Sequence, residues 1–175
     1  GYDTRTGYCD PYLATTAYAK KAKDLGVQVL TGTEVHDLKA NGIVKSVSTS
    51  AGMFETPNLI IAAGGWTAKL CASLGVDVPL KLSRHKVITL KTKEPYSRKW
   101  PIVKDLTTED KIYFRHDSGG VVLVGTGDHG DPIEDSDGLT DHVDMDHVER
   151  ISRLMEQRMP SYGNSELVRS WTGPY

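Results

Sequence analysis

The sequence predicts a chain with an α/β part followed by an α+β part, and three observations support this. The apolar run Leu59–Ala63 stops at Gly64-Gly65, which is typical of a strand buried on both faces of a sheet and ending in a glycine turn. A helix-glycine-strand pattern precedes it at residues 11–30, whereas hairpin patterns dominate after residue 80. We therefore expect two domains, at residues 1–79 and 80–175.

The composition is that of a globular protein and argues against several functional classes. Hydrophobic residues make up 38% of the 175, charged residues 25%, and the formal net charge is -2. The sequence has no basic face or arginine-rich run of the kind that binds nucleic acid. No apolar segment approaches the roughly 20 residues that span a bilayer. Cys9 and Cys71 lie far apart, so we expect buried free thiols in a reducing cytosol rather than a disulfide, and a cytoplasmic protein.

The first element is a helix with clear end signals. Asp10 is a good N-cap, Pro11 suits the first helical position, and Gly26 is typical of the residue after a helix. Val27–Leu30 then predicts a short strand. One apolar face recurs at helical spacing: Leu13, Ala14, Ala17, Tyr18, Ala22 and Leu25.

The next segment predicts a small antiparallel meander. A strand begins at Val35, Asn41-Gly42 is a strong two-residue hairpin turn, and Ile43–Ser48 alternates on the way back. Ala51-Gly52 makes a second turn before Met53–Thr56. This meander leads into the apolar run, after which a short helix at 67–74 is expected to end at Gly75.

The second half predicts an antiparallel sheet with one long helix. Pro95, the cluster 97–99 and Pro101 are expected to break its first strand, and Pro160 to stop its helix. The expected elements are a long strand at 80–93, a hairpin of 112–115 with 121–124 across 117–120, a helix at 144–159 and a last strand at 167–171.

Two groups of residues could bind a ligand. Ala63-Gly64-Gly65 with Trp66 could let a nucleotide approach the backbone closely, or could need glycine only for a strand-to-helix turn. Gly125-Thr126-Gly127 lacks the third glycine and the helix of a dinucleotide motif, so we expect a loop there. Arg84, His85, Tyr113 and Arg115 lie on or beside strands. They could point into a cavity that takes a carboxylate, or could lie on a solvated sheet face.

Residues 128–147 are rich in Asp, Glu and His, which raises the question of a metal site. Their spacing fits neither an EF-hand loop nor a histidine pair on a helix. Asp141, Asp144 and Asp146 are explained as acids at a helix N-terminus, where the macrodipole favours them. His129 and His142 have no nucleophile spaced to meet them. We therefore expect no metal.

The order of the motifs along the chain, rather than any one of them, indicates a family. In sequence they are residues 7–11 (Gly-Tyr-Cys-Asp-Pro), 26–29, 31–35, 47–52, 60–67 (Ile-Ile-Ala-Ala-Gly-Gly-Trp-Thr), 78–80 before Arg84, 113–115 and 122–125. This series resembles the FAD-dependent D-amino-acid oxidase superfamily over nearly the whole chain. The branch of sarcosine oxidase and dimethylglycine dehydrogenase is the most similar.

The resemblance implies a partial Rossmann-like FAD domain with a β-meander, joined to an antiparallel-sheet substrate domain. The implied reaction is oxidation of the C–N bond of a small amine or amino acid, with hydride transfer to the flavin. The implied partner is therefore a small molecule, and the resemblance leaves room for a homo- or hetero-oligomer. The implied residues are Val35, Ala62, Ala63, Gly64, Gly65 and Trp66 for FAD, Arg84 and His85 for substrate, and Tyr113, Arg115 and Tyr175 for catalysis.

Two departures from the family pattern shape the expectation. The Gly-x-Gly-x-x-Gly unit is missing and the chain ends at Pro174-Tyr175, so we expect an internal segment of a longer enzyme, inactive alone. Gly173-Pro174-Tyr175 also places tyrosine where D-amino-acid and glycine oxidases carry the arginine that clamps the substrate carboxylate. The alternatives are a flavoenzyme similar to glycerol-3-phosphate dehydrogenase and a non-catalytic subunit that keeps the fold.

Overall fold

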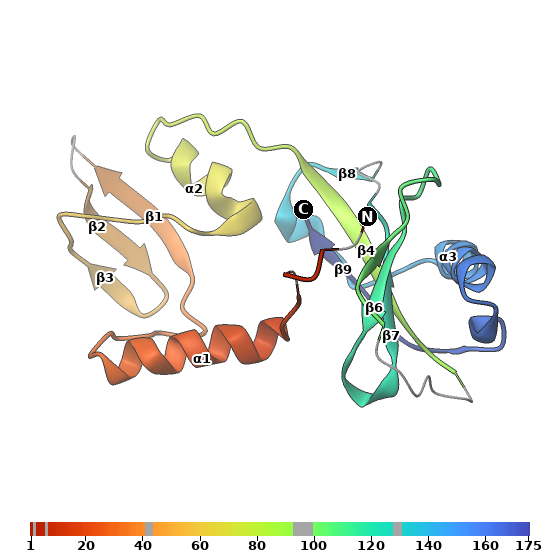
Figure 1. The fold of residues 1–175 in the computed structure, drawn as a ribbon. Helices are drawn as coiled ribbons and strands as arrows, with labels where there is room; N and C mark the ends of the chain where they lie inside the picture. Colours follow the sequence, from red (N-terminus) through yellow and green to blue (C-terminus); the bar gives the residue numbers. More distant parts are fainter. Residues whose placement is uncertain (2, 6, 41–43, 93–99, 128–130) are drawn as a thin grey trace. The chain divides into compact units, whose positions relative to one another are not determined.

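The computed structural model describes residues 1–175 except 2, 6, 41–43, 93–99 and 128–130. The chain divides into two compact units, Gly1–Val78 and Pro79–Tyr175, which are drawn in Figure 1.

Helix α1, Pro11–Asp24, forms as its end signals predict. The Asp10 carboxylate accepts a hydrogen bond from the Leu13 amide at 2.9 Å, and Gly26 takes a φ of +89°, which only glycine adopts without strain. The predicted apolar face is largely exposed, with Leu13 at 64%, Tyr18 at 81% and Leu25 at 71%. The local sequence therefore determines this helix, while packing within the described residues contributes little to it.

The meander is confirmed as an antiparallel sheet of β1 (Val35–Ala40), β2 (Val44–Thr49) and β3 (Gly52–Phe54). Leu38 pairs directly with Val47, and both are buried because they lie on the same face of the sheet. The Thr49 hydroxyl donates to the Gly52 carbonyl at 2.7 Å and closes the second turn. The predicted Asn41-Gly42 turn lies outside the described residues.

Two predicted strands of this unit are wrong. Residues 27–30 and 59–63 form no strand, and Ile60, expected to be buried, is 90% exposed. A segment forms a strand only where a neighbouring strand pairs with its backbone N–H and C=O groups. Among the described residues of this unit, the sheet consists of β1, β2 and β3, and neither segment pairs with it. The predicted short helix is confirmed: a 3₁₀ turn at Gly64–Trp66 leads into α2 (Thr67–Ala72), and Gly75 follows at a φ of +70°.

The second unit contains an antiparallel sheet organised around one long strand, β4. Residues Val87–Leu90 of β4 pair with β7 and also with β9, so these two strands lie on opposite edges of β4. The order is β5-β6-β7-β4-β8, with β9 joined to β4. The strands are β4 (Leu82–Lys91), β5 (Val103–Lys104), β6 (Tyr113–His116), β7 (Val122–Gly125), β8 (Pro132–Ile133) and β9 (Glu166–Pro174).

The predicted long strand, the hairpin and the last strand are thus confirmed, whereas β5 and β8 were not predicted. Both are only two residues long, too short for an alternating pattern to be recognised. The predicted breaks at Pro95 and at 97–99 lie outside the described residues.

Helix α3, Met145–Arg158, covers one face of this sheet, as Figure 1 shows. Directly paired residues of neighbouring strands share a face, so Ile88 of β4 lies beside Val124 of β7 and Phe114 of β6. On the helix side, Val148, Ile151 and Met155 complete this core, as the helical spacing predicts. Leu90, Ile112, Val122, Val143 and Tyr162 are buried in the same cluster.

An ionic network joins the first turn of α3 to β4. Asp144 is the N-cap: one carboxylate oxygen accepts from the His147 amide at 2.7 Å, and the other from the Lys86 ammonium at 3.0 Å. Asp131 lies 3.4 Å from the same ammonium. The hydrogen bond from Lys86 and then that from the His147 amide lower the pKa of Asp144 to about 2. Burial lowers the pKa of the His147 imidazole.

Asp144 is therefore expected to make stability depend on pH in the acid range. Because its pKa falls from 3.8 to about 2 on folding, its contribution is complete above about pH 4 and is lost as the pH falls toward 2. Asp144→Asn keeps a capping oxygen but loses the charge, so it should flatten this part of the profile. Asp144→Ala should also lose the cap, which costs about 1 kcal/mol. Thermal unfolding of the three proteins between pH 2 and 7 measures both effects.

An equal acid response in wild type and Asp144→Asn would contradict this role for Asp144. The matched control is Asp146→Asn. Asp146 lies two residues after Asp144 in the same first turn of α3, and its side chain is exposed, so the substitution removes an acid without removing the cap.

Candidate functional site

The sheet face opposite α3 carries most of the residues predicted to act on a substrate. Tyr113 pairs with Gly125, and Gly125 pairs with Val87, so these residues share a face with His85, two positions before Val87. Tyr175 extends the pairing of β9, because its amide donates to the Ser83 carbonyl at 2.9 Å and its carbonyl accepts from the Ser83 amide at 3.1 Å. Three strands thus bring His85, Tyr113 and Tyr175 together.

These side chains surround a cavity of about 280 Å³. The rings of His85 and Tyr175 stack at 4.2 Å between centroids with 26° between their planes. His85 is only 8% exposed, whereas Tyr175 is 73% exposed, so the stack forms a wall with one open edge. The cavity is lined by His85, Ile102, Lys104, Tyr113, Thr126, Gly127 and Tyr175.

Tyr113 is held in the cavity by the absence of a side chain at Gly125. A Cβ at position 125 would overlap the Tyr113 hydroxyl and the ring carbons beside it. Burial, and then the neighbouring Tyr175, raise the pKa of the Tyr113 phenol above its ordinary value of 10. The phenol therefore stays protonated at neutral pH and can donate a hydrogen bond, so it is suited to binding an anionic group and not to removing a proton.

Arg115 lies two residues beyond Tyr113 on the same face, but its guanidinium is already engaged at the end of β6. Nη1 donates to the His116 carbonyl at 2.9 Å and to the Asp117 carboxylate at 3.0 Å. Both side chains of this ion pair are largely buried, at 15% and 24% exposed. The structure therefore places Arg115 near Tyr113 without making it part of the cavity lining.

Arg84 is separated from the other predicted residues. It precedes His85 in β4, so its side chain takes the opposite face, the one that Lys86 and Ile88 share with α3. Its amide donates to the Asp131 carbonyl at 2.7 Å. Adjacent positions on a strand point to opposite faces, so Arg84 and His85 cannot both line this cavity, although the sequence predicts both as substrate residues.

Sequence reasoning missed four residues of the cavity: Ile102, Lys104, Thr126 and Gly127. Lys104 lies in β5 and pairs directly with Tyr113. Thr126 and Gly127 follow β7, where the Gly-x-Gly pattern does not fit a dinucleotide motif. Two glycines around a buried threonine at the end of a strand are also a signal that other groups approach the backbone closely.

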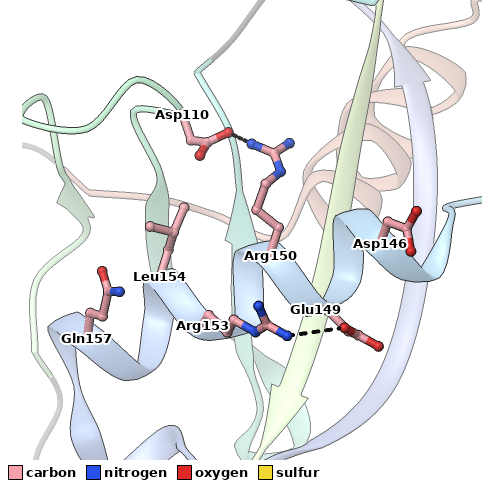
Figure 2. A pocket seen from close by; sticks show the side chains of 7 residues that line it. All are labelled: Asp110, Asp146, Glu149, Arg150, Arg153, Leu154 and Gln157. Carbon is pink, nitrogen blue, oxygen red and sulfur yellow. Dashed lines mark hydrogen bonds and ion pairs between the residues drawn. The ribbon is translucent and has the colours of Figure 1, made fainter.

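A larger hollow of about 470 Å³ lies on α3, and both of its arginines pair with acids that also line it. Figure 2 shows Arg150 extending from α3 toward Asp110, with which it forms an ion pair, and Arg153 beside Glu149 at 3.5 Å. Asp146, Leu154 and Gln157 complete the lining. Because each cation already has an acidic partner, we assign no ligand to this surface.

The predicted FAD residues of the first unit lie at exposed backbone. Gly64 has a φ of +55° and no atom lies within 4 Å of the position of a Cβ, so the turn requires glycine and its surroundings are open. Ala62 is exposed, Trp66 is 42% exposed, and Ala63 and Gly65 are half-buried between them. Val35 begins β1, next to an irregularity in the pairing with β2. This stretch fits a ligand that approaches the backbone closely.

The described residues contain no group of three or more His, Cys, Asp or Glu side chains arranged to hold a metal ion. Within the same part of the chain, no helix is both long enough and apolar enough to cross a membrane. Both cysteines are free, but the expected burial is not found, since Cys9 is exposed and Cys71 is only half-buried.

Comparison with known proteins relates the whole chain to one family. The sequence model of the family described as FAD dependent oxidoreductase matches residues 1–175. The chain is 28% identical over 174 residues to 4-methylaminobutanoate oxidase (formaldehyde-forming) of Paenarthrobacter nicotinovorans, covering 96% of this chain and 21% of that protein. It is 25% identical over 190 residues to the mitochondrial dimethylglycine dehydrogenase of Homo sapiens, covering 99% and 22%.

Among solved structures, the chain is similar to L-proline dehydrogenase from P. horikoshii, with a TM-score of 0.81 and 26% identity over 95% of this chain and 44% of that one. The chain thus spans less than half the length of each of these three proteins. The mixed fold class expected from the sequence is confirmed, although the strands predicted at 27–30 and 59–63 are absent.

Proposed function

The chain belongs to the family of FAD-dependent oxidoreductases, and on this basis we propose that the complete protein oxidises the C–N bond of a small secondary or tertiary amine or amino acid. The observation that best supports this proposal is the cavity in which His85, Tyr113 and Tyr175 converge. The relatives described above are named for 4-methylaminobutanoate, dimethylglycine and L-proline, each a secondary or tertiary amine that also carries a carboxylate, which supports the same substrate class.

For the cofactor, we propose that Ala62, Ala63, Gly64, Gly65 and Trp66 line the adenosine side of FAD, with the backbone at Val35 near the adenine. The open, glycine-dependent turn at Gly64 supports this placement, since a Cβ there would meet no protein atom. When bound, FAD supplies the hydride acceptor, and the protein supplies orientation and electrostatics.

The residues of the second unit would bind and orient the substrate. The protonated Tyr113 phenol would donate a hydrogen bond to an anionic or carbonyl oxygen, and the His85–Tyr175 stack would form an aromatic wall against the apolar part of the amine. Arg115 would act through its charge near Tyr113, while Arg84, on the α3 face, would support β4 rather than touch the substrate.

The test uses the purified full-length protein. We expect visible flavin absorbance that is bleached without oxygen by sarcosine, dimethylglycine or proline, and not by glycerol-3-phosphate. Bleaching by glycerol-3-phosphate alone would favour the alternative dehydrogenase. A colourless protein that takes up no added FAD would rule out the enzyme and leave a non-catalytic subunit.

The cellular location is also a proposal. Two free cysteines, one of them exposed, are typical of proteins in a reducing compartment, which supports a cytoplasmic location. Fractionation of cells that express the full-length protein tests this directly.

A further inference from the structure

Residues 105–112 join β5 to β6, and this loop holds one wall of the cavity. The Gly127 amide donates to the Asp110 carbonyl at 3.0 Å and to the Lys111 carbonyl at 3.2 Å. Gly127 lines the cavity, and a Cβ placed on it would lie 3.2 Å from both the carbonyl oxygen and the Cβ of Lys111. Because the loop and Gly127 are in such close contact, the position of this wall depends on the position of the loop.

The loop meets the wall at a residue with a strained backbone. Lys111 has a φ of +47°, in the left-handed region that a lysine rarely adopts, so the contacts around it must hold it there. Its amide donates to the Thr108 carbonyl at 3.2 Å, and its carbonyl accepts from Gly127. The local sequence does not favour this conformation, and the anchors of the loop therefore matter for it.

Two arginines of α3 anchor the loop, one near each end. Arg158 donates to the Asp105 carboxylate at 2.5 Å. Arg150 forms an ion pair with Asp110, as Figure 2 shows, and the Asp110 side chain is only 15% exposed, so water screens this pair incompletely. Since the paired carboxylate and the carbonyl that accepts from Gly127 belong to the same residue, Arg150 acts on the cavity wall through Asp110 alone.

The guanidinium of Arg150 is held in turn by His147, three residues earlier in α3. Arg150 Nη2 lies 3.3 Å from His147 Nδ1. A guanidinium can only donate hydrogen bonds, so Nδ1 accepts, and the imidazole is neutral with its proton on Nε2. The ring is buried, with 8% of the residue exposed.

The surroundings of His147 favour this neutral form. Burial, and then the Lys86 ammonium on β4, lower the pKa of His147 below its ordinary value of 6.5, whereas Asp144 and Asp131 act in the opposite direction. Arg150 is a further cation beside the ring. Protonation of Nδ1 at lower pH removes the acceptor and places a positive charge against the guanidinium.

We propose that Asp110, Arg150 and His147 are positioning residues that fix the cavity wall at Gly127 from α3, and that protonation of His147 loosens this anchor. The proposal rests on the proposed function, in which the cavity binds the substrate. None of the three residues lines the cavity, so their effect on the substrate passes through the loop.

The first experiment measures substrate oxidation by the full-length flavoprotein with Asp110→Asn, Arg150→Met or both, using whichever of sarcosine, dimethylglycine and proline wild type oxidises best. We expect each single substitution to lower kcat/KM by about 10-fold, since misplacing substrate-binding groups by about 1 Å can cost roughly 100-fold. The double variant should match the single ones, because all three remove the same contact. Arg150→Lys should restore part of the loss.

Arg153→Met is the matched control. It removes the other arginine of the same hollow, which pairs with Glu149 on α3 itself and does not reach the loop. Its kinetics should match wild type. Flavin content and thermal unfolding show whether each variant is folded.

Hydrogen exchange of the Gly127 amide gives a readout that needs no turnover. At about pH 8, where His147 is neutral, exchange measured by mass spectrometry on the segment that contains Gly127 should be several-fold faster in Asp110→Asn and Arg150→Met than in wild type. Arg153→Met should exchange like wild type.

The pH profile tests His147. Wild-type kcat/KM should fall as the pH drops below 6.5, because the neutral ring is lost in that range. His147→Asn keeps an oxygen that can accept from Arg150 but does not titrate, so it should reduce this fall. His85 of the cavity is present in both proteins, so the difference between the two profiles belongs to His147.

The possible failures are distinguishable. If no amine or amino acid bleaches the wild-type flavin, the proposed function fails, while the exchange of Gly127 still decides whether the anchor exists. The positioning role is overturned if Asp110→Asn and Arg150→Met leave either Gly127 exchange or kcat/KM unchanged, or if Arg153→Met changes them equally. Identical pH profiles of wild type and His147→Asn would overturn the part assigned to His147.

Discussion

Replacing Met155 with alanine is expected to lower the free energy of unfolding of the second unit by about 2–5 kcal/mol. Met155 is fully buried in α3 and belongs to the cluster that joins this helix to β4 and β7. Truncation removes apolar contacts and leaves a cavity, which the close-packed strands beneath can fill only partly. The melting temperature of the full-length protein, read by a probe of sheet and helix content, should fall by several degrees.

Met145→Ala is the matched control, because it makes the same chemical change on the same helix. Met145 is the first residue of α3 and is 61% exposed, so its truncation should change stability by less than about 0.5 kcal/mol. Equal effects of the two substitutions would mean that α3 does not pack on the sheet through the face described here.

Gly125→Ala is expected to lower kcat/KM by about 100-fold while the protein still folds. The new Cβ would overlap the Tyr113 hydroxyl and ring, so the ring must leave its place in the cavity. Displacing a substrate-orienting group by about 1 Å can cost a factor of roughly 10² in rate. Overpacking of this kind costs about 1–3 kcal/mol of stability, which the whole fold can tolerate.

Gly138→Ala serves as its control. Like Gly125, Gly138 has a backbone φ outside the left-handed region, so other amino acids can adopt it. Unlike at Gly125, a Cβ at position 138 would meet no atom within 4 Å. We expect its kinetics and melting temperature to match wild type. Unchanged kinetics of Gly125→Ala would show that the position of the Tyr113 ring does not matter for turnover and would remove Tyr113 from the proposed site.

The elements that the sequence predicted correctly are those whose signals are local. Asp10 and Asp144 cap α1 and α3 through hydrogen bonds to amides three residues away, and Gly26 ends the first helix in the left-handed region. The meander and the hairpin of β6 and β7 follow from alternation and turn residues within short segments. The strands predicted at 27–30 and 59–63 failed because a strand needs a partner, and the sequence of one segment does not specify a partner elsewhere.

The candidate site was predicted only in part for a similar reason. Tyr113, His85 and Tyr175 have side chains suited to binding a polar substrate, and the sheet brings them to one cavity. Arg84 also has suitable chemistry, but it is adjacent to His85 on β4 and therefore points to the opposite face. Lys104 was missed because β5 is too short to show alternation, and its place beside Tyr113 depends on pairing with β6.

The sequence by itself therefore determined where helices start and end, where hairpins turn, and which family of flavoenzymes the chain belongs to, because caps, turns and motif order act between close neighbours. Only the tertiary structure decided which side chains share a cavity. That choice is made by strand register: β4 pairs with β7 on one edge and with β9 on the other. A shift of one residue in either pairing would turn every side chain of that strand to the opposite face, and Lys104, Tyr113 and Tyr175 would no longer share a cavity.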